Sequence, residues 1–322
     1  MSSGLPEFGL KLASGDRWRI VATEETSQWA EKFASILRLK NDAVEGDPEI
    51  ILIKSSAGSP DFPRSLLNGK GNNLPQSGWI SYYNINTVWY HPEVDDVIID
   101  VQARQERRIL ADTAREDYNH AELAPEGLLR DYISMAMALF PVYRRAINSV
   151  GFPMHGAFVE RDGKGVLLAA KGGTGKSTCC RRIPEPWQAC SDDEALVTVD
   201  SNGHYEVHSF PTWSDLFFNN TNDNARTWDV QHHVPLSAIF FLEQSKTDEA
   251  VPIGSGVAAG YTYLYATQGY TRSLLGMDHE GQKQENMKIF DDTCRMAKKV
   301  PAYMLKVSLT GRFWEEIDRV LN

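Results

Sequence analysis

Residues 165–197 read GVLLAAKGGTGKSTCCRRIPEPWQACSDDEALV, and the rest of the fold is predicted outward from this stretch. The apolar run at 165–170 predicts a buried strand that stops at the glycine-rich segment 171–175. A helical pattern begins at Lys176 and ends before Pro184. A phosphate-binding loop requires this order, because glycine backbones let several N–H groups converge on an anion at the positive end of a helix.

The candidate nucleotide-binding residues are the seven that follow Lys171: Gly172, Gly173, Thr174, Gly175, Lys176, Ser177 and Thr178. Lys176 would neutralise the outer phosphates of ATP, and the Ser177 hydroxyl would bind Mg²⁺. The full Walker A pattern has a glycine where this chain has Ala170, and alanine serves there if its backbone angles are ordinary. The alternative interpretation is a glycine turn beside a surface lysine.

A pair of acids follows the loop. Asp192 lies sixteen positions after Lys176, at the end of a segment with strand character, and Asp193 follows it. Adjacent carboxylates beside a phosphate loop can divide two tasks, one holding Mg²⁺ and the other orienting or deprotonating an attacking hydroxyl. Both are catalytic candidates, with Lys176, and Asp192 joins Ser177 as a metal-ligand candidate, although the sequence leaves open which acid does which. By itself, an Asp-Asp pair is usually a solvated turn.

These features resemble a known family. His155-Gly156, a strand, the glycine loop, a helix and the acid pair are together similar to HPr kinase/phosphorylase, whose nucleotide domain belongs to the phosphoenolpyruvate carboxykinase-like class. The resemblance is closer to divergent relatives in peptide-maturation cassettes, in particular the C protein of the SynChlorMet cassette. It covers residues 141–322 well, and its further matching segments are 210–215, 234–244 and 311–314.

The resemblance implies a histidine beside the carboxylates, which makes His155 a catalytic candidate. Without the family, a lone histidine is more often a hydrogen-bonded structural group. The resemblance also implies an acceptor site that borders the aromatic segment after the acid pair, where Trp213 and Ser214 are substrate candidates. The alternative for this segment is a packed loop over the sheet. Arg272 is a candidate for neutralising transition-state charge, with an ordinary surface arginine as the alternative.

The composition of the chain excludes some classes of function. The chain has 322 residues and a net charge of −10, which argues against a general nucleic-acid binder because phosphate backbones repel such a surface. Its four cysteines have no metal-binding spacing and predict reduced thiols. No apolar run approaches the length of a membrane span, and the N-terminus lacks the pattern of a secretion signal. We therefore expect a soluble, cytoplasmic protein.

The fold class is predicted as α/β, α+β overall: a mixed HPr kinase-like sheet with a P-loop at 125–322 and a smaller α+β domain at 1–124. In the first part the pattern predicts a strand or hairpin at 10–22, a helix at 27–39, a strand at 50–53 and a flexible loop at 55–78. Pro141 should kink or divide a helix spanning 125–148.

In the second part, Ser201-Asn202-Gly203 predicts a hairpin turn. His204, Glu206 and His208 would then share one strand face and could seat a transition metal, although such a face is more often exposed and polar. The remaining predictions are a strand at 234–242, a flexible linker or loop at 254–260, a helix at 282–299, a strand at 303–309 and a helix at 312–321.

The sequence therefore favours an ATP- and Mg²⁺-dependent kinase that phosphorylates a hydroxyl group. The resemblance suggests a serine of a precursor peptide or protein as the acceptor, and proteins of a radical-enzyme cassette as partners. Two alternatives stay open: a kinase for a small hydroxylated metabolite, and a non-catalytic ATP-binding accessory protein for peptide modification. HPr kinase itself forms hexamers and runs the reverse phosphorolysis, but this chain lacks the long C-terminal arginine-rich motif associated with that double activity, so its oligomeric state and the reverse reaction stay open.

Overall fold

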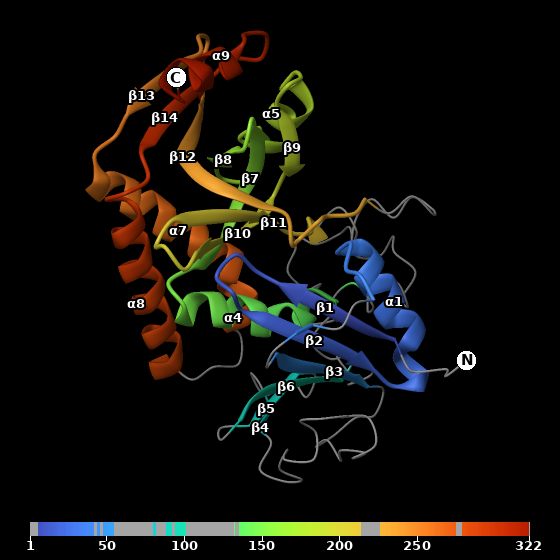
Figure 1. Ribbon diagram of the computed structural model, residues 1–322. Coiled ribbons are helices and arrows are strands. Elements are labelled where there is room, and N and C mark those ends of the chain that lie inside the picture. Colours follow the sequence, from blue (N-terminus) through green and yellow to red (C-terminus); the bar gives the residue numbers. More distant parts are fainter. Residues whose placement is uncertain are drawn as a thin grey trace, which may run out of the picture.

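The chain folds around two β-sheets with helices against them (Figure 1). The computed structural model describes residues 6–41, 44–45, 48–54, 80–81, 88–91, 94–100, 132, 135–213, 226–274 and 279–321. The predicted flexible loop at 55–78 lies outside these residues, as does the predicted domain boundary at 124/125, which therefore stays a prediction. Mixed sheets with helices confirm the coarse prediction of an α+β class.

The N-terminal sheet has six strands in the order β1-β2-β3-β6-β5-β4. The elements of this part are β1 Glu7–Lys11, β2 Arg17–Ala22, η1 Glu24–Thr26, α1 Ser27–Ile36, β3 Glu49–Lys54, β4 Ile80–Ser81, β5 Val88–His91 and β6 Val94–Asp100. β1 and β2 form the predicted hairpin. Trp18, Ile20 and Ala22 are buried together because alternate side chains of a strand share one face. Phe33 and Ala34 of α1 join them in one core.

The C-terminal sheet has eight strands. Its strands are β7 Phe152–Arg161, β8 Lys164–Ala169, β9 Gln188–Ser191, β10 Glu194–Val199, β11 Tyr205–Ser209, β12 His233–Gln244, β13 Glu249–Pro252 and β14 Ala302–Val307. β7 and β8 form a hairpin whose turn residues Asp162 and Gly163 have φ angles of 52° and 73°, as the Asp-Gly pair predicts. β8, β12 and β14 run parallel, so their carboxyl ends lie at one edge.

The C-terminal sheet is buried on both faces, because apolar residues alternate between two cores. Leu167 and Ala169 of β8 join the large core, while Val166 and Leu168 join the smaller one. The helices of this part are α4 Phe140–Asn148, α5 Lys176–Arg182, α7 Ser255–Leu274, α8 His279–Met296 and α9 Phe313–Leu321. α4, α7 and α8 contribute to the large core, which also contains apolar residues of β1, β2 and β3. α5 and α9 cover the opposite face.

Two helices test the predictions on proline and glycine. Pro141 lies in the first turn of α4, and Leu139 precedes that helix as its N-cap, so the predicted division of the helix is confirmed. The predicted linker at 254–260 is wrong, because α7 begins at Ser255 and runs for 20 residues. Tertiary packing outweighs the glycines: Ala258, Ala266 and other residues of α7 are buried in the large core.

Candidate functional site

The glycine loop, residues 171–175, joins β8 to α5 as the sequence predicts. Gly173 and Gly175 have φ angles of 78° and 122°, which side chains rarely adopt. The Thr174 N–H donates to the Lys171 carbonyl at 3.2 Å, and the Gln244 side-chain amide donates to the Thr174 carbonyl at 3.2 Å. Gln244 ends β12, the parallel neighbour of β8, so the sheet edge itself supports the loop.

Lys176, the first residue of α5, is buried although it is charged, with 6% of its surface exposed. Its ammonium nitrogen lies 3.0 Å from the Ala170 carbonyl oxygen, 2.9 Å from His155 Nε2 and 3.6 Å from Asp193 Oδ1. Burial lowers the pKa of Lys176, and the charge of Asp193 opposes that shift. The lysine side chain therefore stays beside the loop and points toward an acid and a histidine.

His155 lies on β7 and links the lysine to the acid. Burial lowers its pKa below 6.5, and the nearby Asp193 carboxylate counteracts part of the shift. A neutral ring has one donor and one acceptor nitrogen. Since Lys176 donates to Nε2, Nδ1 carries the hydrogen and faces Asp193 Oδ1 at 3.5 Å. The geometry thus assigns one tautomer to His155.

The backbone places Asp193 between β9 and β10. The Gly156 N–H donates to the Asp193 carbonyl at 2.9 Å, and Glu194 pairs with His155 in the antiparallel β7–β10 ladder. About a third of the Asp193 side chain is exposed, at 33%. Asp193 is therefore the acid of the pair that faces the glycine loop and still reaches solvent.

Asp192 has a different environment. It is buried, and its Oδ1 accepts hydrogen bonds from the Thr212 hydroxyl at 2.7 Å and from Arg226 Nη1 at 2.8 Å. The sequence reasoning missed Thr212 and Arg226. Thr212 falls in the segment 210–215 that carried the family resemblance, whereas Arg226 follows an amide-rich stretch and offers no local signal.

The other predicted residues are placed less completely. Ser177 and Thr178 lie partly exposed in the first turn of α5. Trp213 is buried, which fits the packed-loop alternative, and Ser214 lies outside the described residues. Arg272 is near the end of α7, but its side chain is outside the described part of the structure. The structure thus brings together Lys176, His155 and Asp193, whereas the predictions for Ser214 and for the Arg272 side chain lie outside the described residues.

Strand β11 has neither the exposed polar face nor the metal site that its sequence suggested. Glu206 and His208 are buried, and His204 pairs instead with Asp200 at the hairpin turn. Glu206 accepts a hydrogen bond from His233 at 2.9 Å. Within the described ranges, no three His, Cys, Asp or Glu side chains lie close enough to hold a metal ion.

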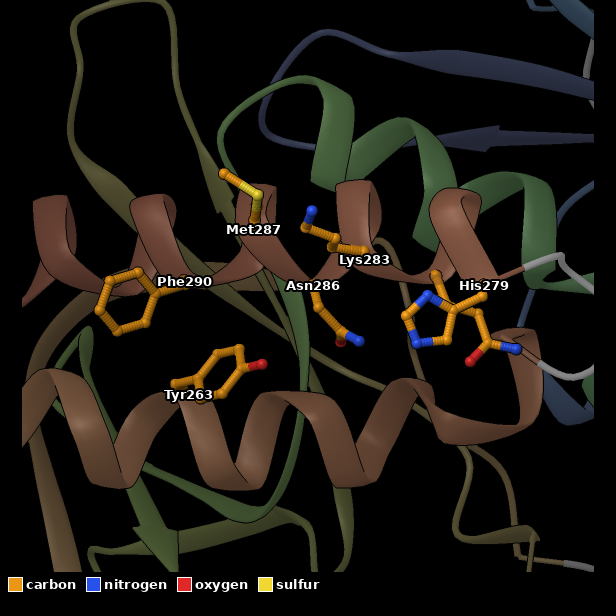
Figure 2. A pocket seen from close by; sticks show the side chains of 7 residues that line it. Tyr263, His279, Lys283, Asn286, Met287 and Phe290 are labelled. Atoms are coloured by element: carbon orange, nitrogen blue, oxygen red, sulfur yellow. The ribbon is translucent and has the colours of Figure 1, made fainter.

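A hollow lies between α7 and α8, with a volume of about 430 Å³. Figure 2 shows the side chains that line it: Tyr263, His279, Gln282, Lys283, Asn286, Met287 and Phe290. The Tyr263 and Phe290 rings meet edge to face at 5.5 Å. Tyr265, two positions from Tyr263, projects from another side of α7, where the backbone of Lys171 opposes the rise in its pKa that burial causes. The hollow is therefore separate from the glycine-loop site.

Comparison with known families gives a match over residues 128–322 to the family described as SynChlorMet cassette protein ScmC. The chain belongs to this family. The match confirms the closer of the two resemblances and contains the glycine loop and both acids of the ScmC-family chain. No curated protein matches the chain. Across the residues described, no helix combines the length and apolar character needed to cross a membrane.

Proposed function

We propose that this ScmC-family protein is an ATP- and Mg²⁺-dependent kinase with the phosphoenolpyruvate carboxykinase-like fold of HPr kinase, acting on a serine hydroxyl of a peptide or protein. One observation carries the proposal: the buried ammonium of Lys176, next to the glycine loop, lies 3.6 Å from Asp193 Oδ1. Phosphoryl transfer needs a cation for the phosphates and a carboxylate for the nucleophile in one place, because catalysis there is positioning and electrostatic stabilisation.

In the proposed reaction the acceptor oxygen forms a bond to the γ-phosphorus of ATP. The bond from that phosphorus to the β–γ bridging oxygen breaks, and ADP leaves with the electron pair. Asp193 takes the hydroxyl proton, since it is the acid that reaches solvent, and His155 Nδ1–H keeps its carboxylate oriented. Lys176 and the loop N–H groups neutralise the charge that develops on the transferred group.

The oxygen donors beside the loop fit Mg²⁺. Ser177 and Asp192 offer a hydroxyl and a carboxylate, and Mg²⁺ typically takes one or two carboxylates plus waters and substrate phosphates. A site of this kind needs no cluster of three protein ligands. When bound, the ion would neutralise the β- and γ-phosphate oxygens. Arg226 also bonds Asp192 Oδ1, so the guanidinium and the metal would compete for one carboxylate.

The peptide acceptor rests on the resemblance to proteins of peptide-maturation cassettes. The test is mass spectrometry of peptides encoded near the gene after incubation with the protein and MgATP. We expect wild type and a control, Asp291→Asn on the exposed side of α8, to add phosphate to one peptide, and Asp193→Asn to add none. Equal phosphate gain with Asp193→Asn would remove that acid from the mechanism.

The same experiment separates the alternatives. Tight MgATP binding with no turnover on any peptide or metabolite would support the accessory protein instead. Turnover confined to small hydroxylated metabolites would support the metabolite kinase. Absence of nucleotide binding by calorimetry would end the kinase proposal altogether.

A further inference from the structure

The C-terminal end of α1 is closed by residues 226–230 of the C-terminal part. A helix leaves its last carbonyls without partners inside the helix. Here the Leu39 N–H donates to the Ala34 carbonyl at 2.8 Å and the Arg38 N–H donates to the Ser35 carbonyl at 3.2 Å. These two bonds form a Schellman turn, with Arg38 as its left-handed residue at a φ angle of 51°.

The next two carbonyls are satisfied from outside the N-terminal part. The Trp228 N–H donates to the Ile36 carbonyl at 2.8 Å, and the Val230 N–H donates to the Leu37 carbonyl at 3.5 Å. Trp228 is buried, with 1% of its surface exposed. The segment 226–230 is therefore fixed in place by the end of α1.

Arg38 adds a side-chain contact to this joint. Its Nε donates to the Thr227 hydroxyl at 2.8 Å. Glycine is the usual residue in the left-handed position of a Schellman turn, and another residue there carries backbone strain. Arg38 is thus less favourable than glycine for the turn itself, while its side chain holds the residue next to Arg226.

Arg226 reaches from this fixed segment into the candidate site. Its guanidinium bonds Asp192 Oδ1 at 2.8 Å and lies 5.4 Å from the centre of the Trp228 ring. Its side chain is 40% exposed, so it can move without unfolding the segment. Its positive charge also acts on the Cys180 thiol, one helical turn after Lys176, where it opposes the rise in pKa that burial causes. Arg226 therefore lies on the side of α5 where the Cys180 thiol contacts the Ser191 carbonyl at 3.8 Å, next to Asp192.

We propose that Arg226 is a catalytic residue that neutralises charge on the transferred phosphoryl group, and that Arg38 is the positioning residue that holds it there. The proposal rests on the kinase function above. Charge on the transferred group spreads over its equatorial oxygens, and an arginine is suited to bind two of them at once. If Mg²⁺ were bound to Asp192, the Arg226 guanidinium would no longer be held by that carboxylate and could contact the transferred phosphoryl group. The end of α1 and the turn after it thereby acquire a role in the reaction.

The test uses a transition-state analogue and needs no acceptor. The affinity for MgADP is measured with and without aluminium fluoride, which mimics the transferred phosphoryl group. We expect wild type to bind far more tightly with aluminium fluoride. Arg226→Gln should lower this enhancement at least about 100-fold without weakening MgADP binding, because the arginine acts on the transition state and only competes with the metal for Asp192 before it. Arg226→Lys should retain part of the aluminium fluoride enhancement, because lysine keeps the positive charge but cannot bind two oxygens at once as the guanidinium does.

Arg38→Gly separates positioning from stability. Glycine suits the turn, so the midpoint of thermal unfolding should not fall, whereas the aluminium fluoride enhancement should drop about tenfold. Arg17→Gln is the matched control, because Arg17 donates to the Glu45 carbonyl within the N-terminal part and should change neither quantity.

The outcomes distinguish this inference from the function on which it rests. A wild type that binds no MgADP refutes the kinase function and the inference with it. A wild type that binds MgADP without any enhancement, or an Arg226→Gln variant that keeps the full enhancement, overturns the role of Arg226 alone. An unchanged enhancement in Arg38→Gly overturns the positioning role.

Discussion

Replacing His208 with glutamine should change how the stability of the protein depends on pH. His208 is fully buried on β11, at 0% exposure. Its Nδ1–H donates to the Val230 carbonyl at 2.9 Å, and its Nε2 accepts a hydrogen bond from the Ala13 N–H at 3.3 Å. Burial, together with the neighbouring rings of His233 and His232, lowers the pKa of His208 from 6.5 to about 3. The imidazole therefore joins the first hairpin to the C-terminal sheet only while it is neutral.

The sign and size of the effect follow from linkage. The folded pKa is below the unfolded one, so the unfolded state binds the proton first and the stability from His208 is complete above pH 6.5. It is lost as the pH falls from 6.5 toward 3. Between pH 7 and pH 5 the unfolding free energy falls by about 2 kcal/mol, because the histidine of the unfolded chain gains a proton over this range while the folded imidazole stays neutral. This interval lies above the folded pKa, so the unfolded pKa alone sets the loss.

The assay is urea unfolding at pH 7, 6 and 5, followed by tryptophan fluorescence. The quantity compared is the change in unfolding free energy with pH, because the substitution also removes packing at every pH. We expect His208→Gln to lose about 2 kcal/mol less than wild type across this range. His204→Gln is the matched control, since His204 is 71% exposed at the same hairpin. Parallel losses in wild type and His208→Gln would refute the neutral, buried imidazole.

Three further outcomes are expected. Lys176→Met should weaken MgATP binding about 10- to 100-fold, because a charge-assisted contact with the phosphates is lost. Calorimetry measures this affinity, and an unchanged value would mean that the lysine does not reach the phosphates. Gly269→Ala should lower the unfolding free energy by roughly 1–3 kcal/mol, because the new Cβ would lie 3.2 Å from the backbone nitrogen of His155. Gly260→Ala on the same helix meets open space and should instead raise it by about 0.5–1 kcal/mol; the reverse order in urea unfolding would contradict the packing of α7 on β7. Burial raises the pKa of three thiols: Cys179 to about 11, Cys180 to about 12 and Cys190 to about 12. Iodoacetamide at pH 8, followed by mass spectrometry, should therefore label them slowly until urea is added, and rapid labelling of the folded protein would show that they are exposed.

Local signals were enough to predict the elements that carry the site. The Asp162-Gly163 pair specifies a tight hairpin, and the glycines after the apolar run of β8 specify the loop. Both depend on backbone angles that few residues adopt, so the sequence alone fixes them. The contact of Lys176 with Asp193 was predictable as well, because the loop and the acid pair follow strands of one sheet.

Contacts between distant segments left no such signal. Arg226 is 34 residues from Asp192 in sequence, and nothing in its neighbours marks it as a partner. Arg272 was the arginine predicted to neutralise transition-state charge, with an ordinary surface arginine as the alternative, and that prediction stays untested because its side chain lies outside the described residues. The glycines at the start of α7 were misread for a related reason: their cost to the helix is about 1 kcal/mol each, which the burial of Tyr265 and Tyr270, together with Ala258 and Ala266, in the large core offsets.

The family match begins at residue 128, yet the matched region depends on what precedes it. One core contains Phe33 of α1 together with Phe152 and Tyr270 of the C-terminal part. Removing the first hundred or so residues would expose this apolar surface and would leave the Val230 and Trp228 N–H groups without the carbonyls of α1. The segment that carries Arg226 would lose its support at the same time. A fragment limited to the matched residues should therefore lose the Asp192–Arg226 contact before it loses the glycine loop, which the edge of the C-terminal sheet supports through Gln244.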